Sequence, residues 1–294
     1  MEKFASEGFM NCAVRRIGLF TVLLISTNLL LSGCVVPDDQ RDGAPKNHPV
    51  DINSIPDPIP EKLPKSRFGN PKSYVVFGKR YFVLDSADGY RKKGIASWYG
   101  TKFHGRLTST REPYNMFSMT AASPVLPIPC YARVTNLKNG RSVIVKVNDR
   151  GPFAPNRIID LSYAAATKLG YTKQGTAMVE VEAITGDHPE LAAASKRPVY
   201  TRKSHFYSAS GHPVTKPPQL YLQVAAFHME ANALELKKKL EEITQHKIFI
   251  KTVQGQIKMI YKVQIGPLAG IEESDRLLAE IIHLKLGNPI TVIG

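Results

Sequence analysis

The carboxyl group of Asp149 is the side chain of this sequence best placed for acid–base chemistry. It follows the apolar strand pattern of residues 143–147 and lies in the tight turn formed by residues 148–152. Partial burial at the end of a strand would raise the pKa of a carboxyl group towards that of a useful proton donor. A second interpretation stays open, in which Asp149 caps its own turn or pairs with Arg150.

A second reactive group is the thiol of Cys34, which ends an apolar run. Residues 17–31 carry no charge, follow two arginines and are closed by Ser32 and Gly33. The run is shorter than the about 20 residues of a membrane span. The pattern resembles the bacterial lipobox and predicts a signal peptide over residues 1–33, with Met10 as an alternative start and an uncleaved helix as the alternative structure. Lipid on Cys34 would anchor the chain to a membrane, and Val35 favours the inner leaflet of the outer membrane, facing the periplasm.

Basic residues outnumber acidic ones by 39 to 25, which gives a formal net charge of +14. Such an excess is typical of proteins that bind nucleic acid or an anionic surface. A periplasmic location excludes nucleic acid and favours anionic cell wall or lipid head groups. Cys130 is the one thiol outside the signal and anchor region, so we expect it to be buried and no disulfide to form. The His and Cys residues lack metal-ligand spacing, and neither a metal nor a cofactor is expected.

Two stretches without hydrophobic periodicity divide the rest of the chain. Residues 34–72 are rich in proline, and residues 187–217 combine proline, serine and basic side chains. These compositions are typical of solvated linkers. We therefore expect folded units at 73–186 and 218–294, and the charge of the second linker leaves open a contact with an anionic wall.

Short β-type runs bounded by turn residues indicate a small barrel or sandwich between the linkers. The dipeptide Asn139-Gly140 predicts a hairpin between residues 131–137 and 141–147. Ser162 and Gly170 flank the one helix predicted here, over residues 163–169. The predicted strands are residues 74–77, 81–84, 95–99, 131–135, 142–147 and 177–184.

The last unit alternates strand and helix patterns in a βαββαβ order. Apolar residues recur at helical spacing over 233–243 and 271–284. Because side chains alternate along a strand, Gln223, Lys262 and Gln264 are predicted to face outward, away from the helices. The predicted strands are residues 220–227, 247–253, 257–265 and 290–293, with Leu222, Val224, Val263 and Ile265 facing the helices.

Ordered motifs in the first unit resemble the successive signatures of the rare lipoprotein A (RlpA) family. The last unit carries two motifs that resemble the paired signatures of the SPOR domain. The resemblance implies a mainly β plus α+β fold, with a six-stranded double-psi β-barrel followed by a small βαββαβ SPOR domain. The motifs are Gly94-Ile-Ala-Ser-Trp-Tyr-Gly100, Phe103-His-Gly-Arg106, Met119-Thr-Ala-Ala122, Arg133-Val-Thr-Asn-Leu137, Val147-Asn-Asp-Arg-Gly-Pro-Phe153, Ile159-Asp-Leu-Ser162, Tyr221-Leu-Gln-Val-Ala-Ala-Phe227 and Tyr261-Lys-Val-Gln-Ile-Gly-Pro267.

The resemblance implies a lytic transglycosylase that cuts the glycan of peptidoglycan, preferably strands stripped of stem peptides. One carboxyl group can protonate the leaving glycosidic oxygen and then deprotonate the muramic six-position hydroxyl, which closes an anhydro ring. Ordinary hydrolysis instead uses two carboxylates and consumes water. The resemblance implies Asp149 for this role, with Glu112 assisting. It further implies SPOR binding of denuded glycan at the septum through Gln223, Lys262 and Gln264, with division-site proteins as partners.

Two positions depart from the family's site, since its histidine is Ser123 here and its second aspartate is Asn115. Serine cannot act as a base near neutral pH, although its hydroxyl can orient a sugar or a water molecule. His104 is the nearest imidazole in the sequence, either as a substitute or as a structural side chain. The sequence therefore leaves open an enzyme and a non-catalytic peptidoglycan-binding lipoprotein, while the linkers give weak support to a scaffold for other envelope enzymes.

Aromatic and basic side chains beside these motifs are candidates for glycan contacts. Trp98 and Tyr99 could form a platform under a sugar ring, because C–H groups suit an aromatic face. Arg106 and Arg150 could contact carboxylate or acetamido groups. Each residue also has a structural alternative, as a core aromatic or as the partner of an acidic side chain.

Overall fold

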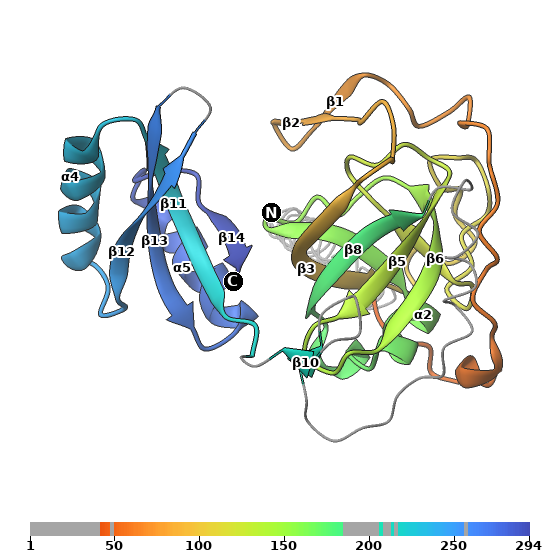
Figure 1. Cartoon of the computed structure of the whole chain (residues 1–294). Coiled ribbons are helices and arrows are strands. Elements are labelled where there is room, and N and C mark those ends of the chain that lie inside the picture. Colours follow the sequence, from red (N-terminus) through yellow and green to blue (C-terminus); the bar gives the residue numbers. More distant parts are fainter. Residues whose placement is uncertain (1–41, 48–49, 185–205, 208–212, 215–216, 256–257) are drawn as a thin grey trace, which may run out of the picture. The chain divides into compact units, whose positions relative to one another are not determined.

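The structure is a computed structural model of the whole chain, and it describes residues 42–47, 50–184, 206–207, 213–214, 217–255 and 258–294 (Figure 1). The predicted signal peptide and the lipidation site Cys34 lie outside the described residues, as does most of the predicted basic linker. Residues 42–294 form one compact unit. None of the helices in these described ranges could span a membrane.

Six strands form a closed barrel, which confirms the barrel predicted from the sequence (Figure 1). The strands follow one another around the barrel in the order β3-β7-β4-β6-β5-β8. The pairs β3–β7 and β4–β6 are parallel, and the other pairs are antiparallel. The bounds are β3 Arg91–Tyr99, β4 Thr120–Ala122, β5 Cys130–Asn136, β6 Ser142–Asp149, β7 Arg157–Ser162 and β8 Ala177–Ile184.

Local signals in the barrel act as the sequence predicts. Helix α2 (Tyr163–Leu169) begins after Ser162, whose Oγ accepts a hydrogen bond from the backbone N–H of Ala165 at 3.2 Å. It ends at Gly170, whose φ of +77° suits a residue without a Cβ. Strands β5 and β6 form the hairpin predicted from Asn139-Gly140. The apolar core includes Ala96, Val134, Val145, Val147, Ile159, Leu161, Val179 and Val181.

Four of the predicted strands, at 95–99, 131–135, 142–147 and 177–184, belong to the barrel as β3, β5, β6 and β8, but the other two barrel strands were missed. Strands β4 and β7 were not among the predicted strands, and β4 is too short for an alternating pattern to be visible. The predicted strands at 74–77 and 81–84 lie outside the barrel, where β1 (Ser73–Val76) pairs with β2 (Lys79–Phe82) in a separate two-stranded sheet. Its tip residue Phe77 is 90% exposed, because no other element of the described chain covers it.

Part of the predicted proline-rich linker packs on the barrel. The short 3₁₀ helix η2 (Ile52–Ser54) buries Ile52 in the barrel core. Asp57 follows, and its carboxylate accepts hydrogen bonds from the backbone N–H of Ile144 at 2.8 Å and from Lys168 Nζ at 3.1 Å. These contacts extend the compact unit upstream of residue 73.

The C-terminal strands form a four-stranded antiparallel sheet in the order β12-β13-β11-β14. Its elements confirm the predicted βαββαβ order, and Leu222, Val224, Val263 and Ile265 are buried in one core with residues of both helices. The bounds are β11 Leu220–Phe227, α4 Glu230–Glu241, β12 Ile248–Gln254, β13 Met259–Leu268, α5 Ile271–His283 and β14 Ile290–Ile293, preceded by the short pair β9 Phe206–Tyr207 and β10 Pro213–Val214.

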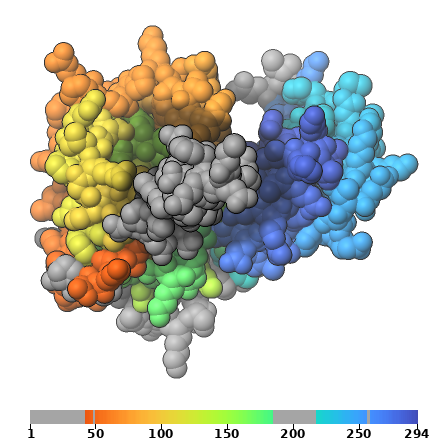
Figure 2. All heavy atoms as spheres, turned by 180° about the vertical axis from the view of Figure 1, so that it is seen from behind, coloured from red at the N-terminus to blue at the C-terminus, as the bar shows by residue number. Residues whose placement is uncertain are grey.

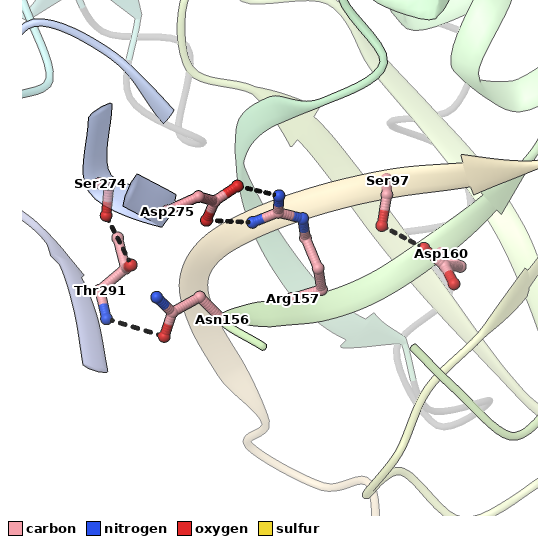
Figure 3. Close-up of polar contacts among 7 residues, drawn as sticks. All are labelled: Ser97, Asn156, Arg157, Asp160, Ser274, Asp275 and Thr291. Atoms are coloured by element: carbon pink, nitrogen blue, oxygen red, sulfur yellow. Dashed lines mark hydrogen bonds and ion pairs between the residues drawn. The ribbon is translucent and has the colours of Figure 1, made fainter. Parts of the chain in front are cut away.

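Polar contacts join the barrel to the C-terminal fold at the start of β7 (Figure 3). Arg157 donates two hydrogen bonds to the carboxylate of Asp275, at 3.2 and 2.5 Å. The side-chain oxygen of Asn156 accepts a hydrogen bond from the backbone N–H of Thr291 at 3.2 Å. Strand β7, which carries Asp160, therefore begins at these contacts.

Candidate active site

Two aspartates lie in one row of the barrel. Ala122 in β4 pairs with Asp149 in β6 on one side and with Asp160 in β7 on the other. Neighbouring strands lie about 4.8 Å apart, so the two aspartate Cα atoms are separated by about 10 Å. Ser97 in β3 pairs with Asp160 and extends the row. Residues in one row face the same side of a sheet, so the two carboxyl groups share a face.

A β-bulge in β6 directs Asp149 onto that face. The pairing of β4 with β6 runs from Ala121 opposite Val147 to Ala122 opposite Asp149, which leaves Asn148 as the extra residue. In regular register Asn148 would occupy the place of Asp149. Bulges are common beside active sites because they redirect a side chain in this way.

Asp160 has the properties of a proton donor. Burial raises the pKa of Asp160 to about 6, against the hydrogen bond from the Ser97 hydroxyl and the charge of Arg157 (Figure 3). The negative charges of Asp42 and Asp149 raise this pKa further. A carboxyl group with a pKa near 6 can release and regain a proton close to neutral pH.

Asp160 belongs to the family motif at residues 159–162, but the motif alone does not indicate a chemical role for it. The available signal was a single carboxyl group between Ile159 and Leu161, in an apolar stretch that leads into a capped helix. Ile159 and Leu161 are both fully buried in the structure. An apolar strand pattern in the sequence can predict this burial on either side of Asp160. The raised pKa depends on the fold around the strand and is not visible in the sequence.

Asp149 is held at the end of β6 by three donors. Its Oδ1 accepts hydrogen bonds from the backbone N–H of Ser109 at 2.8 Å, from the Ser109 hydroxyl at 2.6 Å and from the backbone N–H of Arg150 at 2.7 Å. One oxygen of Asp149, Oδ1, therefore caps the turn, as the second interpretation of the sequence predicts. The same contacts fix the position of the carboxylate, which a catalytic group also requires.

Glu112 lies beside the bulge and is held as an ionised carboxylate. It accepts hydrogen bonds from Lys146 Nζ at 2.7 Å and from Asn148 Nδ2 at 2.9 Å. Partial burial acts to raise the pKa of Glu112, but the hydrogen bonds from Lys146 and Asn148 outweigh it and lower the pKa. Glu112 therefore suits a fixed negative charge that positions Asn148, next to Asp149, and does not suit a proton donor.

The two residues that depart from the family's site, Ser123 and Asn115, stabilise local turns, as does the nearest imidazole in the sequence, His104. Ser123 is 1% exposed, and its hydroxyl oxygen accepts backbone hydrogen bonds from the turn that follows it. His104 is exposed, and its Nδ1 accepts the backbone N–H of Met116 at 3.2 Å. The side-chain oxygen of Asn115 accepts the backbone N–H of Phe117 at 3.0 Å. These contacts favour a structural role for His104.

The aromatic residues predicted as a sugar platform are held within the fold. Trp98 donates its indole N–H to the carbonyl of Thr172 at 3.2 Å. Tyr99 is 7% exposed and stacks on Tyr114, with ring centroids 4.1 Å apart. Burial raises the pKa of Tyr99 well above its ordinary value, and the charges of nearby groups, Asp149 among them, add to this effect. The Tyr99 hydroxyl therefore keeps its proton close to the two aspartates.

The two arginines predicted to contact glycan differ in their surroundings. The guanidinium group of Arg150 donates to the carbonyl oxygens of Gly69 at 2.7 Å, Ser123 at 2.9 Å and Leu126 at 2.5 Å. These bonds favour a structural role in joining the turn of Asp149 to two other loops. Arg106 is exposed, on the loop that follows β3.

The polar surface predicted on the C-terminal sheet is partly enclosed. Gln264 is 5% exposed, and its amide donates to the side-chain oxygen of Gln223 at 3.4 Å. Lys262 in β13 lies directly opposite Lys251 in β12. Two like charges at one level make this part of the sheet electropositive.

Cys130 is predicted to resist thiol reagents in the folded chain. Burial raises the pKa of its thiol to about 12, so almost none of it is thiolate at pH 8. We expect DTNB to label residues 35–294 at least about 100-fold more slowly in buffer than in denaturant. Equal labelling rates in the two conditions would contradict the burial of this thiol.

Comparison with known proteins gives consistent similarities. A family model described as "Lytic transglycolase" matches residues 91–181, and one described as "SPOR domain" matches residues 216–289. A protein of Pseudomonas aeruginosa named "Endolytic peptidoglycan transglycosylase RlpA" is 38% identical over 99% of each chain. The protein of the same name from Vibrio cholerae is 48% identical over 60% of this chain and 66% of its own. A solved structure, "Crystal structure of RlpA SPOR domain from Pseudomonas aeruginosa", is 36% identical, with a TM-score of 0.24, over 25% of this chain and 96% of that one.

Proposed function

Because the chain belongs to the RlpA family of endolytic peptidoglycan transglycosylases, we propose that it cleaves the glycan strands of peptidoglycan and leaves anhydromuramic ends. The observation that carries the proposal is the pair Asp149 and Asp160, which share one face on either side of Ala122. Ser123 replaces the family's histidine, but both members of the carboxyl pair are present. The pair supports an enzyme over the non-catalytic binding lipoprotein.

The pair can perform the reaction in two steps. In the first, the acid form of Asp160 donates its proton to the glycosidic oxygen, and the bond from this oxygen to the muramic C1 breaks. The carboxylate of Asp149 stabilises the positive charge that develops on the sugar ring. In the second, the carboxylate of Asp160 removes the proton of the six-position hydroxyl while its oxygen bonds to C1. No water is consumed, and Asp160 regains its proton.

In this mechanism Asp160 performs both proton transfers and Asp149 stabilises the positive charge, whereas the sequence resemblance implied Asp149 for both proton transfers. The support for this mechanism is chemical, because Asp160 has the raised pKa and Asp149 has three donors to its Oδ1. Glu112 assists by holding Asn148 at the bulge. Arg106 is our proposed glycan contact, while Trp98, Tyr99, Arg150 and Ser123 are proposed to shape the site from within the fold.

The remaining parts of the proposal concern location. The lipobox-like pattern at Cys34 supports a lipid anchor in the outer membrane, with the barrel in the periplasm. The C-terminal SPOR domain is proposed to bind denuded glycan through Gln223, Lys262 and Gln264, near the electropositive pair of Lys251 and Lys262. Such binding would enrich the protein at the septum, close to division-site proteins.

The test uses residues 35–294, which contain the whole compact unit, and sacculi whose stem peptides have been removed. We expect mass spectrometry to detect anhydromuramic ends, and fewer of them from sacculi that keep their stem peptides. Intact glycan with binding preserved would overturn the enzymatic proposal in favour of a binding lipoprotein. Equal cleavage of the two kinds of sacculi would remove the preference for denuded strands.

A further inference from the structure

The first described residues of the chain bind the loop that follows β3. The carboxylate of Asp42 accepts hydrogen bonds from the backbone N–H of Gly100, at 3.0 and 3.1 Å to its two oxygens, and from that of Lys102 at 3.1 Å. The carbonyl of Gly43 accepts the backbone N–H of Thr101 at 3.0 Å. Figure 2 shows the red-orange start of the described chain against the yellow residues that follow β3. Three consecutive N–H groups therefore bind acceptors from one short segment.

The loop has the construction of a carboxylate site. Successive backbone N–H groups that converge on one acceptor form an anion-binding nest. A Cβ atom at Gly100 would lie 2.1 Å from the carbonyl oxygen of Gly43, so glycine is what allows an acceptor to approach the backbone here. Lys102 adds a positive charge to the same loop. The backbone supplies the site, and a carboxylate of the chain itself fills it.

This nest lies close to the proposed catalytic pair. Gly100 is three residues beyond Ser97, whose hydroxyl donates to Asp160. The charge of Asp42 acts on Asp160 as well as on Tyr114. A carboxylate in the nest is therefore near the group that would protonate the glycosidic bond.

The substrate class of the proposed function carries a carboxylate of its own. The lactyl group of muramic acid ends in a free carboxylate only after the stem peptide has been removed. In a peptide-bearing strand the same carbon is a neutral amide with a bulky substituent. A nest that selects a carboxylate thus separates denuded from peptide-bearing strands by charge as well as by size.

We propose, on the basis of the proposed function, that the N–H groups of Gly100 and Lys102 bind the lactyl carboxylate of a denuded strand. Asp42 occupies this subsite until a strand displaces it. The chain then carries its own competitor for substrate. A competitor that fills the subsite nine-tenths of the time weakens apparent substrate binding about tenfold. The subsite would explain a preference for denuded glycan within the barrel, independently of the SPOR domain.

The test compares three glycans on isotope-labelled residues 35–294. They are denuded GlcNAc–MurNAc oligosaccharides, the same oligosaccharides with their lactyl carboxylates converted to methylamides, and chitin oligosaccharides, which lack the lactyl group. The readout is the backbone amide NMR signals of Gly100 and Lys102, which report binding at the nest whether or not a bond is cut. We expect the free carboxylate form to shift both signals at a concentration at least about tenfold lower than the other two.

Variants distinguish the subsite from its internal competitor. Asp42→Asn is expected to shift the two signals in the free chain and to lower the half-saturating concentration of the denuded oligosaccharide about tenfold. Asp51→Asn is the matched control, because it removes one charge from the same segment at a residue whose carboxylate accepts the N–H of Asn53. This control is expected to behave as the wild type.

The outcomes separate this proposal from the proposed function. Equal responses to the carboxylate and methylamide forms would overturn the subsite, even if strands are cleaved. Unchanged Gly100 and Lys102 signals in free Asp42→Asn would overturn the internal competitor. A carboxylate-dependent response in a chain that cleaves nothing would uphold the subsite and overturn the transglycosylase.

Discussion

Asp160→Asn is expected to abolish glycan cleavage and to make the folded chain more stable at pH 8. Asparagine keeps an oxygen that can accept the hydrogen bond of Ser97, but it cannot donate a proton to the glycosidic oxygen. We expect at least about a 100-fold loss of anhydromuramic ends, the scale of a general acid. In the wild type, cleavage is expected to fall as pH rises above about 6, because the reaction starts from the protonated form of Asp160.

The stability effect follows from the same pKa. Between pH 3.8 and about 6, an aspartate with the ordinary pKa of 3.8 is ionised in the unfolded chain, whereas Asp160 is still protonated in the folded chain. The free energy of unfolding is therefore highest below pH 3.8 and falls as pH rises through about 6. The loss is at most about 3 kcal/mol. Asp160→Asn removes this loss, so its advantage in urea unfolding should be absent at pH 3.5 and largest at pH 8.

Ser97→Ala is the matched control for this prediction. It keeps the carboxyl group and removes the hydrogen bond that favours the ionised form. We expect cleavage to persist, with its decline moved to higher pH. If Asp160→Asn proved less stable than the wild type at pH 8, the carboxylate would be a structural group, and the assignment of the proton to Asp160 would be wrong.

Asp149→Asn is expected to lower kcat by at least about 100-fold with little change in KM. The charge of Asp149 is required when positive charge develops on the sugar, so its loss should affect the transition state more than binding. Asparagine can still accept the hydrogen bonds of Ser109 and Arg150, which should preserve the turn. The measurement is the rate of formation of anhydromuramic ends as a function of glycan concentration.

Two further measurements test the role of Asp149. Ser109→Ala removes one of the donors to Asp149 but keeps the charge, and we expect a loss of about tenfold or less. Removing the negative charge of Asp149 should also lower the pKa of Asp160 and move the pH decline of residual activity downward. An Asp149→Asn chain as active as the wild type would exclude Asp149 from the mechanism.

Much of the fold was predictable because its signals are local. Side-chain alternation predicted that Leu222 and Val224 are buried, and the structure confirms it. Ser162 and Gly170 predicted both ends of α2, because a capping hydroxyl and a left-handed glycine act on residues within one turn. The family motifs then identified the barrel and the SPOR domain, and the roles of Asp149 and Glu112 that they imply stay predictions.

The tertiary structure decided how these residues meet. Asp149 and Asp160 lie on one face, on either side of Ala122, because β4 pairs with both β6 and β7 and the bulge at Asn148 sets the register. The pKa of Asp160 depends on burial by the whole barrel, and Asp42 reaches Gly100 across 58 positions of sequence. The sequence by itself determined most of the strands and helices, but not β4 and β7, since periodicity and capping are local, and it proposed Asp149 and Glu112 as site residues. Register, desolvation and long-range contacts arise only when all the elements pack together, so the paired site and its occupied nest became visible in the fold alone.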